Sequence, residues 1–200
     1  RSWWRWSGVL FGVAGAIEDT TVEEARAQLE TNFLGTHRLC RAVLPGMRER
    51  RSGRIVNIGS LAGLVSVPFQ AFYCATKYAV EAYTEALRME VRPFGIHVSL
   101  IEPGDFATGF TSKRRMVRAS GASSAYDARC RAAVGRMAAD EARNADIGPV
   151  VRKVIEVVES EKPRLRYPVA NLLQRAVVAL RPALPASWFE FLIMNNYEIR

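Results

Sequence analysis

The chain has 200 residues, 49% of them hydrophobic, with a formal net charge of +8, which fits one domain with a sizeable core and excludes a second full domain. Three widely spaced cysteines without a CxxC pair and two isolated histidines predict neither a disulfide framework nor a metal site, and they favour a reducing, cytoplasmic setting. We expect no membrane span, since no apolar stretch reaches the required ~18 residues, and no signal peptide.

The first twenty residues are rich in glycine, which invites comparison with a phosphate-binding loop. The spacing GxGxxG is absent, and Glu18 and Asp19 stand where a helix N-terminus would have to receive a pyrophosphate. We therefore favour an irregular start over residues 1–8, followed by a glycine-rich loop that leaves a short strand.

A long helix is predicted from the overlapping capping boxes at Thr20 and Thr21. Apolar residues then recur at three- and four-residue steps toward Pro45. The helix is expected to end with Pro45, Gly46 and the charged run Arg48-Glu49-Arg50-Arg51. Asn32 and Gly35 are poor residues for a helix interior, so a kink or a functional amide is expected near them.

Two strands rich in β-branched residues flank a second long helix. The strands are predicted over residues 54–60 and 96–101, and the helix over residues 72–91. This alternation predicts an α/β fold with a doubly wound parallel sheet flanked by helices. In such folds ligands bind beyond the carboxyl ends of the strands, where Ser60 and Pro103-Gly104 lie.

The segment from residue 105 to residue 146 has no strand signal and is predicted to form one or two short helices in a lid-like excursion. Between residues 111 and 136, seven basic residues face one acid, Asp127. Such a cluster can meet nucleic acid, an anionic membrane or a phosphorylated ligand. Because neither a nucleic-acid motif nor interleaved aromatic residues accompany it, we favour a solvated basic face and expect no nucleic-acid partner.

The C-terminal part is predicted to contain a helix over residues 147–159 and an edge strand over residues 164–169. Pro168 places the strand at an edge because proline cannot donate to a ladder. Helices broken at Pro182 and Pro185 follow. Their apolar and aromatic cluster, around Trp188, is expected to cover the core or a ligand pocket, with a weak membrane-surface contact as the alternative.

The chemistry is predicted to centre on Ser60, Tyr73 and Lys77. Tyr73 and Lys77 are four residues apart and share one helix face, and Ser60 follows a strand thirteen residues earlier. A phenol with an ordinary pKa near ~10 is a poor acid or base at neutral pH, but a neighbouring cation lowers that pKa. The three side chains can therefore handle a proton on a carbonyl or alcohol oxygen.

Taken together, the motifs resemble those of the classical short-chain dehydrogenase/reductase family, over about residues 8–170. The matching segments are Asn32 in NFLGTHRLCRAVLP, Ser60 in GRIVNIGSLAG, Tyr73 and Lys77 in YCATK, and Pro103, Gly104 and Thr108 in IEPGDFAT. The run Arg166-Tyr167-Pro168-Val169 also looks like a late strand of the larger steroid- and retinol-dehydrogenase-like members.

The resemblance implies an NAD(P)-dependent oxidoreductase that interconverts an alcohol and a ketone or aldehyde, with NADP or NAD as cofactor. Tyr73 would be the general acid/base and would also contact the cofactor, and Ser60 would hydrogen-bond the substrate oxygen. Lys77 would bind the nicotinamide ribose and lower the pKa of Tyr73. Asn32 would hold a water in the proton relay. Pro103, Gly104 and Thr108 would lie along the nicotinamide and its phosphates.

The resemblance also implies a small-molecule alcohol or ketone substrate, with a lipid-like one (a steroid, retinoid or fatty aldehyde) favoured by the apolar tail. It further implies a homo-oligomer formed through the helices of residues 22–50 and 72–92.

The family's glycine-rich TGxxxGxG turn is missing from these 200 residues. We therefore expect an N-terminally truncated Rossmann-like domain with residues 1–6 read from a wrong frame. It divides into a start (1–8), a catalytic core (9–110), the excursion (111–146) and C-terminal helices with an edge strand (147–200). The alternative is a catalytically inactive remnant that acts at most by association.

Overall fold

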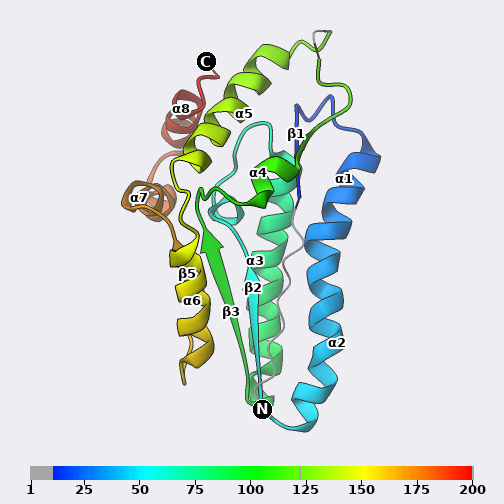
Figure 1. Cartoon of the computed structure of the whole chain (residues 1–200), viewed down its shortest axis with the longest axis vertical. Coiled ribbons are helices and arrows are strands. Elements are labelled where there is room, and N and C mark those ends of the chain that lie inside the picture. The colour runs from blue at the N-terminus through cyan, green and yellow to red at the C-terminus, as the bar shows by residue number, and fades with distance from the viewer. Residues whose placement is uncertain (1–10, 122, 200) are drawn as a thin grey trace.

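The computed structural model describes residues 11–121 and 123–199 (Figure 1). Its elements are β1 (Gly12–Ala14), α1 (Val22–Leu29), α2 (Gly35–Glu49), β2 (Gly53–Ile58), α3 (Ala71–Val91), β3 (Ile96–Pro103), α4 (Gly109–Lys113), β4 (Arg114–Met116), α5 (Asp127–Ala142), α6 (Gly148–Glu159), β5 (Arg166–Val169), α7 (Leu172–Leu180) and α8 (Ala186–Asn196). The expectations for residues 1–8 lie outside the described residues.

A parallel three-stranded sheet in the order β2-β3-β5 forms the centre of the molecule. Ile58 is paired with Ile101, and Leu100 is paired with Arg166. The predicted α/β class with parallel strands flanked by helices is therefore confirmed. The predicted edge strand is confirmed as well, with Pro168 in register with Glu102.

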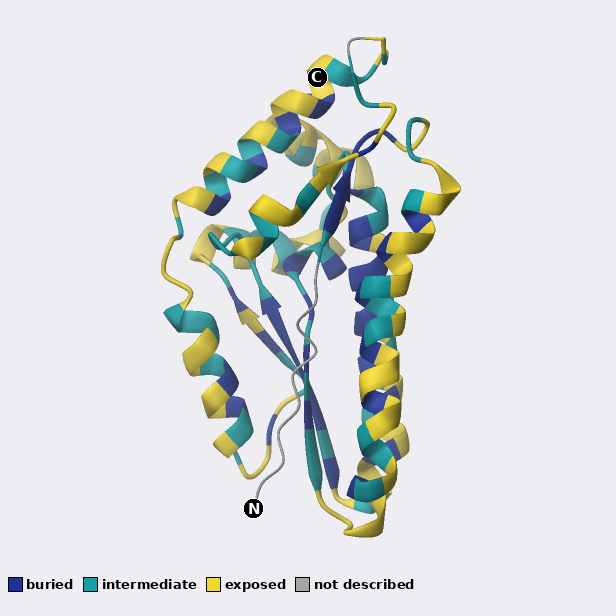
Figure 2. Ribbon diagram, turned by 45° about the vertical axis from the view of Figure 1, so that its right-hand side comes forward, coloured by how far each residue is buried: buried dark blue, intermediate teal, exposed yellow. Residues whose placement is uncertain are grey.

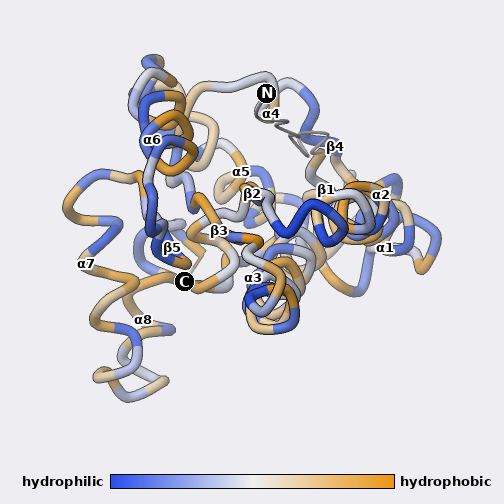
Figure 3. The backbone as a smooth tube through the Cα atoms, turned by 90° about the horizontal axis from the view of Figure 1, so that it is seen from below, coloured by the Kyte–Doolittle hydropathy of each residue, from blue (hydrophilic) through white to orange (hydrophobic). Residues whose placement is uncertain are grey.

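Helices cover both faces of this sheet (Figure 3). On one face, α2 and α3 pack against β2 and β3 through a core that includes Met47, Leu87 and Val98. On the other face, α6 packs against β3 and β5 through a core that includes Val157 and Ile101. Buried residues accordingly line the inner sides of the helices, and their outer sides are exposed (Figure 2).

The predicted first helix is observed with its capping box, in which the Thr21 side chain accepts from the backbone N–H of Glu24. The expected kink is a π-helical turn over Glu30–Leu34, which joins α1 to α2. The expected end of the helix is confirmed, because α2 passes Pro45 and ends at Glu49, within the charged run that follows. Packing of Met47, only 1% exposed, into the core offsets the hydrogen bond that Pro45 removes.

The excursion differs from its prediction in two ways. It contains a strand, β4, which runs parallel to β1 with Gly12 paired to Arg114, and its helix α5 is 16 residues long. A three-residue strand is too short to give a periodic signal, and its partner lies about a hundred residues away in the chain. This pairing ties the excursion to the segment that precedes α1.

The C-terminal helix α8 corrects a further expectation, since it buries no residue. Trp188 and Phe191 are 68% and 57% exposed instead of covering the core. Apolar residues occur all round α8, so their side chains do not gather in one cluster on one buried face. The chain breaks expected at Pro182 and Pro185 are observed between α7 and α8.

Within residues 11–121 and 123–199, the structure contains no helix with both the length and the apolar character needed to cross a membrane. All three cysteines are free and buried.

Candidate active site

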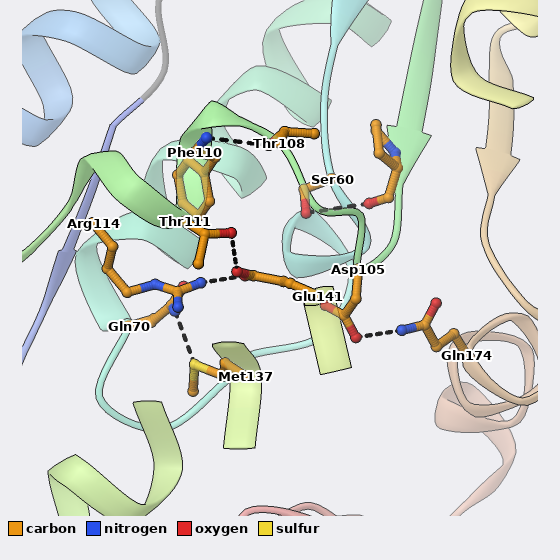
Figure 4. Close-up of polar contacts among 11 residues, drawn as sticks. Ser60, Gln70, Asp105, Thr108, Phe110, Thr111, Arg114, Met137, Glu141 and Gln174 are labelled. Atoms are coloured by element: carbon orange, nitrogen blue, oxygen red, sulfur yellow. Dashed lines mark hydrogen bonds and ion pairs between the residues drawn. The ribbon is translucent and has the colours of Figure 1, made fainter. Parts of the chain in front are cut away.

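Ser60 lies just beyond the carboxyl end of β2, two residues after the strand ends at Ile58. Its Oγ accepts from the backbone N–H of Ala62 at 3.1 Å, which caps a short 3-10 turn, and it lies 3.5 Å from the carbonyl oxygen of Pro103 (Figure 4). The chain therefore holds the Ser60 hydroxyl beside the carboxyl end of β3, where parallel α/β proteins bind ligands.

Tyr73 lies in the first turn of α3 and is only 8% exposed. Its ring packs against that of Phe110 with 4.9 Å between centroids, and its side chain hydrogen-bonds with Ser60. Burial raises the pKa of the Tyr73 phenol to about 12, although the Ser60 hydrogen bond acts in the opposite direction. In this structure burial thus outweighs any lowering of that pKa by a neighbouring cation.

Lys77 is fully buried one helical turn after Tyr73, and its Nζ lies 5.8 Å from the centre of the Tyr73 ring. Burial lowers the pKa of the Lys77 ammonium to about 7, while the charge of Glu81 raises it. The ammonium has three N–H donors and donates one of them to the Ile58 carbonyl at 3.0 Å. Lys77 is thus held at the carboxyl end of β2.

Asn32 is 1% exposed in the π-helical turn between α1 and α2. Its Nδ2 donates to the Phe11 carbonyl at 2.9 Å, and its Oδ1 accepts from the Phe11 N–H at 3.3 Å. The expected functional amide is thus engaged with the backbone that leads into β1.

Gln28 is a second buried amide that sequence reasoning missed. Its Nε2 donates to the Phe11 carbonyl and its Oε1 accepts from the Val13 N–H, both at 2.7 Å. The four-residue spacing of Gln28 and Asn32, on one helix face, is the signal that could have found it.

The remaining predicted residues follow one another at the end of β3. Pro103 accepts from Ser60, but the N–H of Gly104 donates to Val169 at 2.9 Å, and a Cβ on Gly104 would lie 2.3 Å from Oε1 of Gln174 in α7. Thr108 caps α4 by accepting from the N–H of Phe110 at 3.2 Å. The structure therefore brings the Pro103 carbonyl to the Ser60 hydroxyl. Gly104 instead packs against α7, and Thr108 caps α4, the helix that carries Phe110.

A buried network lies on the other side of Phe110 (Figure 4). Glu141 in α5 accepts from both Thr111 and Arg114, and the Arg114 and Glu141 side chains are only 5% and 9% exposed. The expected solvated basic face is thus wrong for Arg114, because its guanidinium is paired internally. Asp105 lies nearby, and burial together with the charge of Glu141 raises the pKa of its carboxyl to about 6.

No group of three or more His, Cys, Asp or Glu side chains in the described part of the chain is arranged to hold a metal ion.

The chain is similar in sequence to members of one protein family. The profile of the family described as short chain dehydrogenase matches residues 8–118. A 3-ketodihydrosphingosine reductase from Bacteroides thetaiotaomicron is 36% identical over 94% of this chain and 70% of its own. Human 17-beta-hydroxysteroid dehydrogenase type 1 and retinol dehydrogenase 8 are 41% and 42% identical over 51% of this chain, and the match covers 31% and 33% of theirs.

Solved structures give the same fold. A short-chain dehydrogenase from Streptomyces avermitilis superimposes with a TM-score of 0.74 at 29% identity, over 96% of this chain and 68% of its own. Two further structures, below 25% identity, show likeness in fold only. A short chain dehydrogenase/reductase from Burkholderia phymatum in complex with NAD superimposes with a TM-score of 0.73 at 24% identity, over 89% of this chain and 64% of its own. A Burkholderia cenocepacia gluconate 5-dehydrogenase with NADP gives 0.55 at 20% identity, over 82% and 61%. The chain thus spans only part of each of these proteins.

Proposed function

The chain belongs to the short-chain dehydrogenase family, and on that premise we propose that it carries the catalytic part of an NAD(P)-dependent oxidoreductase that interconverts an alcohol and a ketone or aldehyde. The observation that carries the proposal is the meeting of Ser60, Tyr73 and Lys77 at the carboxyl ends of β2 and β3. When bound, the dinucleotide supplies or accepts the hydride.

The chain's own residues manage the proton. In the direction of reduction, the Tyr73 phenol gives its proton to the substrate oxygen as the carbonyl carbon is reduced, and solvent later returns a proton to the phenolate. Ser60 donates a hydrogen bond where negative charge develops on that oxygen. Lys77 holds the ribose hydroxyls, and its positive charge stabilises the phenolate against the cost of burial.

The other predicted residues have supporting roles in this proposal. Asn32 holds a water of the proton relay, and hydrogen bonds to the Phe11 backbone fix the position of its amide. Pro103, Gly104 and Thr108 lie along the nicotinamide and its phosphates. The residues fit the nicotinamide end of the cofactor, and the glycine-rich turn of the family is not in this sequence. Proteins of this fold bind NAD or NADP, and both stay open for this chain.

We propose a lipid-like ketone or alcohol as substrate. Three relatives support this, since their names specify a ketosphingoid base, a steroid and a retinol. The exposed apolar side chains of α7 and α8, such as Leu172 at 82% and Trp188 at 68%, suit an apolar ligand. Residues 111–146 act as a lid. Phe110, the residue just before this segment, covers the Tyr73 ring.

A second candidate is an association module without catalysis. A hollow of about 480 Å³ lies on α2 and α3 and is lined by Leu44, Leu87 and Phe94 among others. An apolar hollow on two long helices suits a homo-oligomer formed through residues 22–50 and 72–92. The same surface would also serve the proposed enzyme, so cofactor binding distinguishes the two candidates.

Titration of the purified protein with NADH and NADPH, followed by a long-chain ketone, tests the proposal. Saturable binding of one dinucleotide and ketone-dependent loss of its absorbance are the expected results. A folded protein that binds neither dinucleotide contradicts the enzyme and leaves the association module.

A further inference from the structure

A second cluster of ionisable groups begins one helical turn beyond Lys77 along α3. Tyr73, Lys77, Glu81 and Glu85 follow one another at four-residue spacing along one face of α3. Glu81 and Glu102 are buried, 5% and 1% exposed, and Glu102 is the residue before Pro103 at the end of β3.

The two carboxyl groups lie around one atom, Nε of Arg166, which is 3.0 Å from Oε2 of Glu81 and 3.6 Å from Oε1 of Glu102. One oxygen of each, Oε1 of Glu81 and Oε1 of Glu102, is buried without any N–H or O–H donor from other residues. Two buried carboxylates held around one guanidinium nitrogen cannot both be ionised at low cost, and a single shared proton satisfies both oxygens at once. The pair therefore holds one proton and one negative charge.

The surrounding charges agree with this count. From β5, Arg166 reaches Glu81 at 3.0 Å and Glu102 at 3.6 Å, and it also contacts Glu85. Arg166 is shared with Glu85, which is half exposed, so it neutralises only part of the buried pair. Burial raises the pKa of both carboxyl groups, and the charge of Glu81 also raises that of Glu102, so the shared proton belongs to the pair as a whole.

We propose that Glu81 and Glu102 form a proton-sharing pair that keeps Lys77 positively charged at neutral pH. The pair places one negative charge a single helical turn from an ammonium group that burial would otherwise discharge. Glu81 and Glu102 are positioning residues, since they act through Lys77. The inference rests on the proposed function, because it concerns the reaction that Lys77 serves.

Two variants of equal size separate this role from a merely structural one. Glu81→Gln leaves the single negative charge of the pair on Glu102 and takes it from Glu81, the carboxyl that raises the pKa of Lys77, so the alkaline limb of the pH profile of kcat/KM is expected to move down by about one unit. Glu102→Gln supplies a permanent N–H donor and keeps Glu81 ionised, so its alkaline limb is expected to stay in place or move up. A shift of both limbs to lower pH, or a shift of neither, contradicts the proposal.

Infrared spectroscopy of the same proteins gives a readout that needs no turnover. The wild type is expected to show the band of a protonated, buried carboxyl group at pH 7, and both variants are expected to lose it. Absence of the band in the wild type overturns the shared proton even if the enzyme turns over. A wild type that shows the band but binds no dinucleotide overturns the proposed function, and with it the role of the pair in the reaction, while the shared proton stands.

Discussion

The Nζ of Lys77 lies 5.8 Å from the centre of the Tyr73 ring, one helical turn away, and both side chains are buried. Burial acts on the two groups in opposite directions, because it disfavours the charged form of each. It raises the pKa of the phenol to about 12 and lowers that of the ammonium to about 7. The protein thus keeps a neutral phenol beside an amine whose charge depends on its surroundings.

The lowered pKa of Lys77 predicts that binding of the dinucleotide depends on pH. Lys77 is protonated below a pKa of about 7, so its positive charge is present in acid and is lost as the pH rises through that value. Because kcat/KM reports groups of the free enzyme, it is expected to fall on the alkaline side. Lys77→Met, which keeps the buried volume, should bind NADH and NADPH more weakly and should lack this limb. The measurement is kcat/KM and dinucleotide Kd from pH 5 to 9.

The half-buried Lys153 offers a matched control for that experiment, since it is ion-paired with Glu156 on α6. Lys153→Met should leave both the limb and the affinity unchanged. An alkaline limb that survives in Lys77→Met would assign the titration to another group.

The amides of Gln28 and Asn32 are predicted to stabilise the fold through the backbone of residues 11–13. Gln28→Ala leaves the Val13 N–H, a buried donor, without its partner, which should cost about 1–3 kcal/mol of unfolding free energy. Asn32→Ala should cost a similar amount through Phe11. Denaturant unfolding measures both losses.

The control for the amide experiment is Asn195→Ala on the exposed side of α8, which should stay within about 0.5 kcal/mol of the wild type. Equal stability of Gln28→Ala and Asn195→Ala would show that the Gln28 hydrogen bonds contribute nothing.

The raised pKa of Glu102 predicts how the stability of the folded protein changes with pH. Its pKa is raised above the ordinary value of 4.5 in the folded protein. The folded state therefore binds the proton more tightly than the unfolded state, so this contribution to stability is complete below pH 4.5 and is lost as the pH rises through the folded pKa. Glu102→Gln should flatten that part of the curve. Thermal unfolding from pH 4 to 9 measures it, and an unchanged slope in the variant would contradict the assignment.

Local signals predicted most of the elements. The capping box at Thr21, the β-branched runs before Ser60 and Pro103, and the apolar periodicity of α3 act within a few residues, so they are legible in the sequence. They also predicted the parallel sheet and the site residues that lie at its carboxyl edge.

The missed features depend on contacts between distant parts of the chain. The pairing of β1 with β4 joins segments about a hundred residues apart, and the burial of Arg114 depends on Glu141 in α5. The proton shared by Glu81 and Glu102 likewise needs β3 beside α3.

The central claim is that Tyr73 gives its proton to the substrate oxygen, and Tyr73→Phe tests it most directly. The measurement is the rate at which the protein oxidises NADH or NADPH in the presence of a long-chain ketone, together with the Kd of the dinucleotide. Tyr78→Phe is the matched control, since Tyr78 lies on the same helix and its hydroxyl accepts from Arg181. The account predicts that Tyr73→Phe loses about 10²–10⁴-fold in kcat with an unchanged dinucleotide Kd, while Tyr78→Phe keeps its rate. Near-normal turnover by Tyr73→Phe would contradict the account.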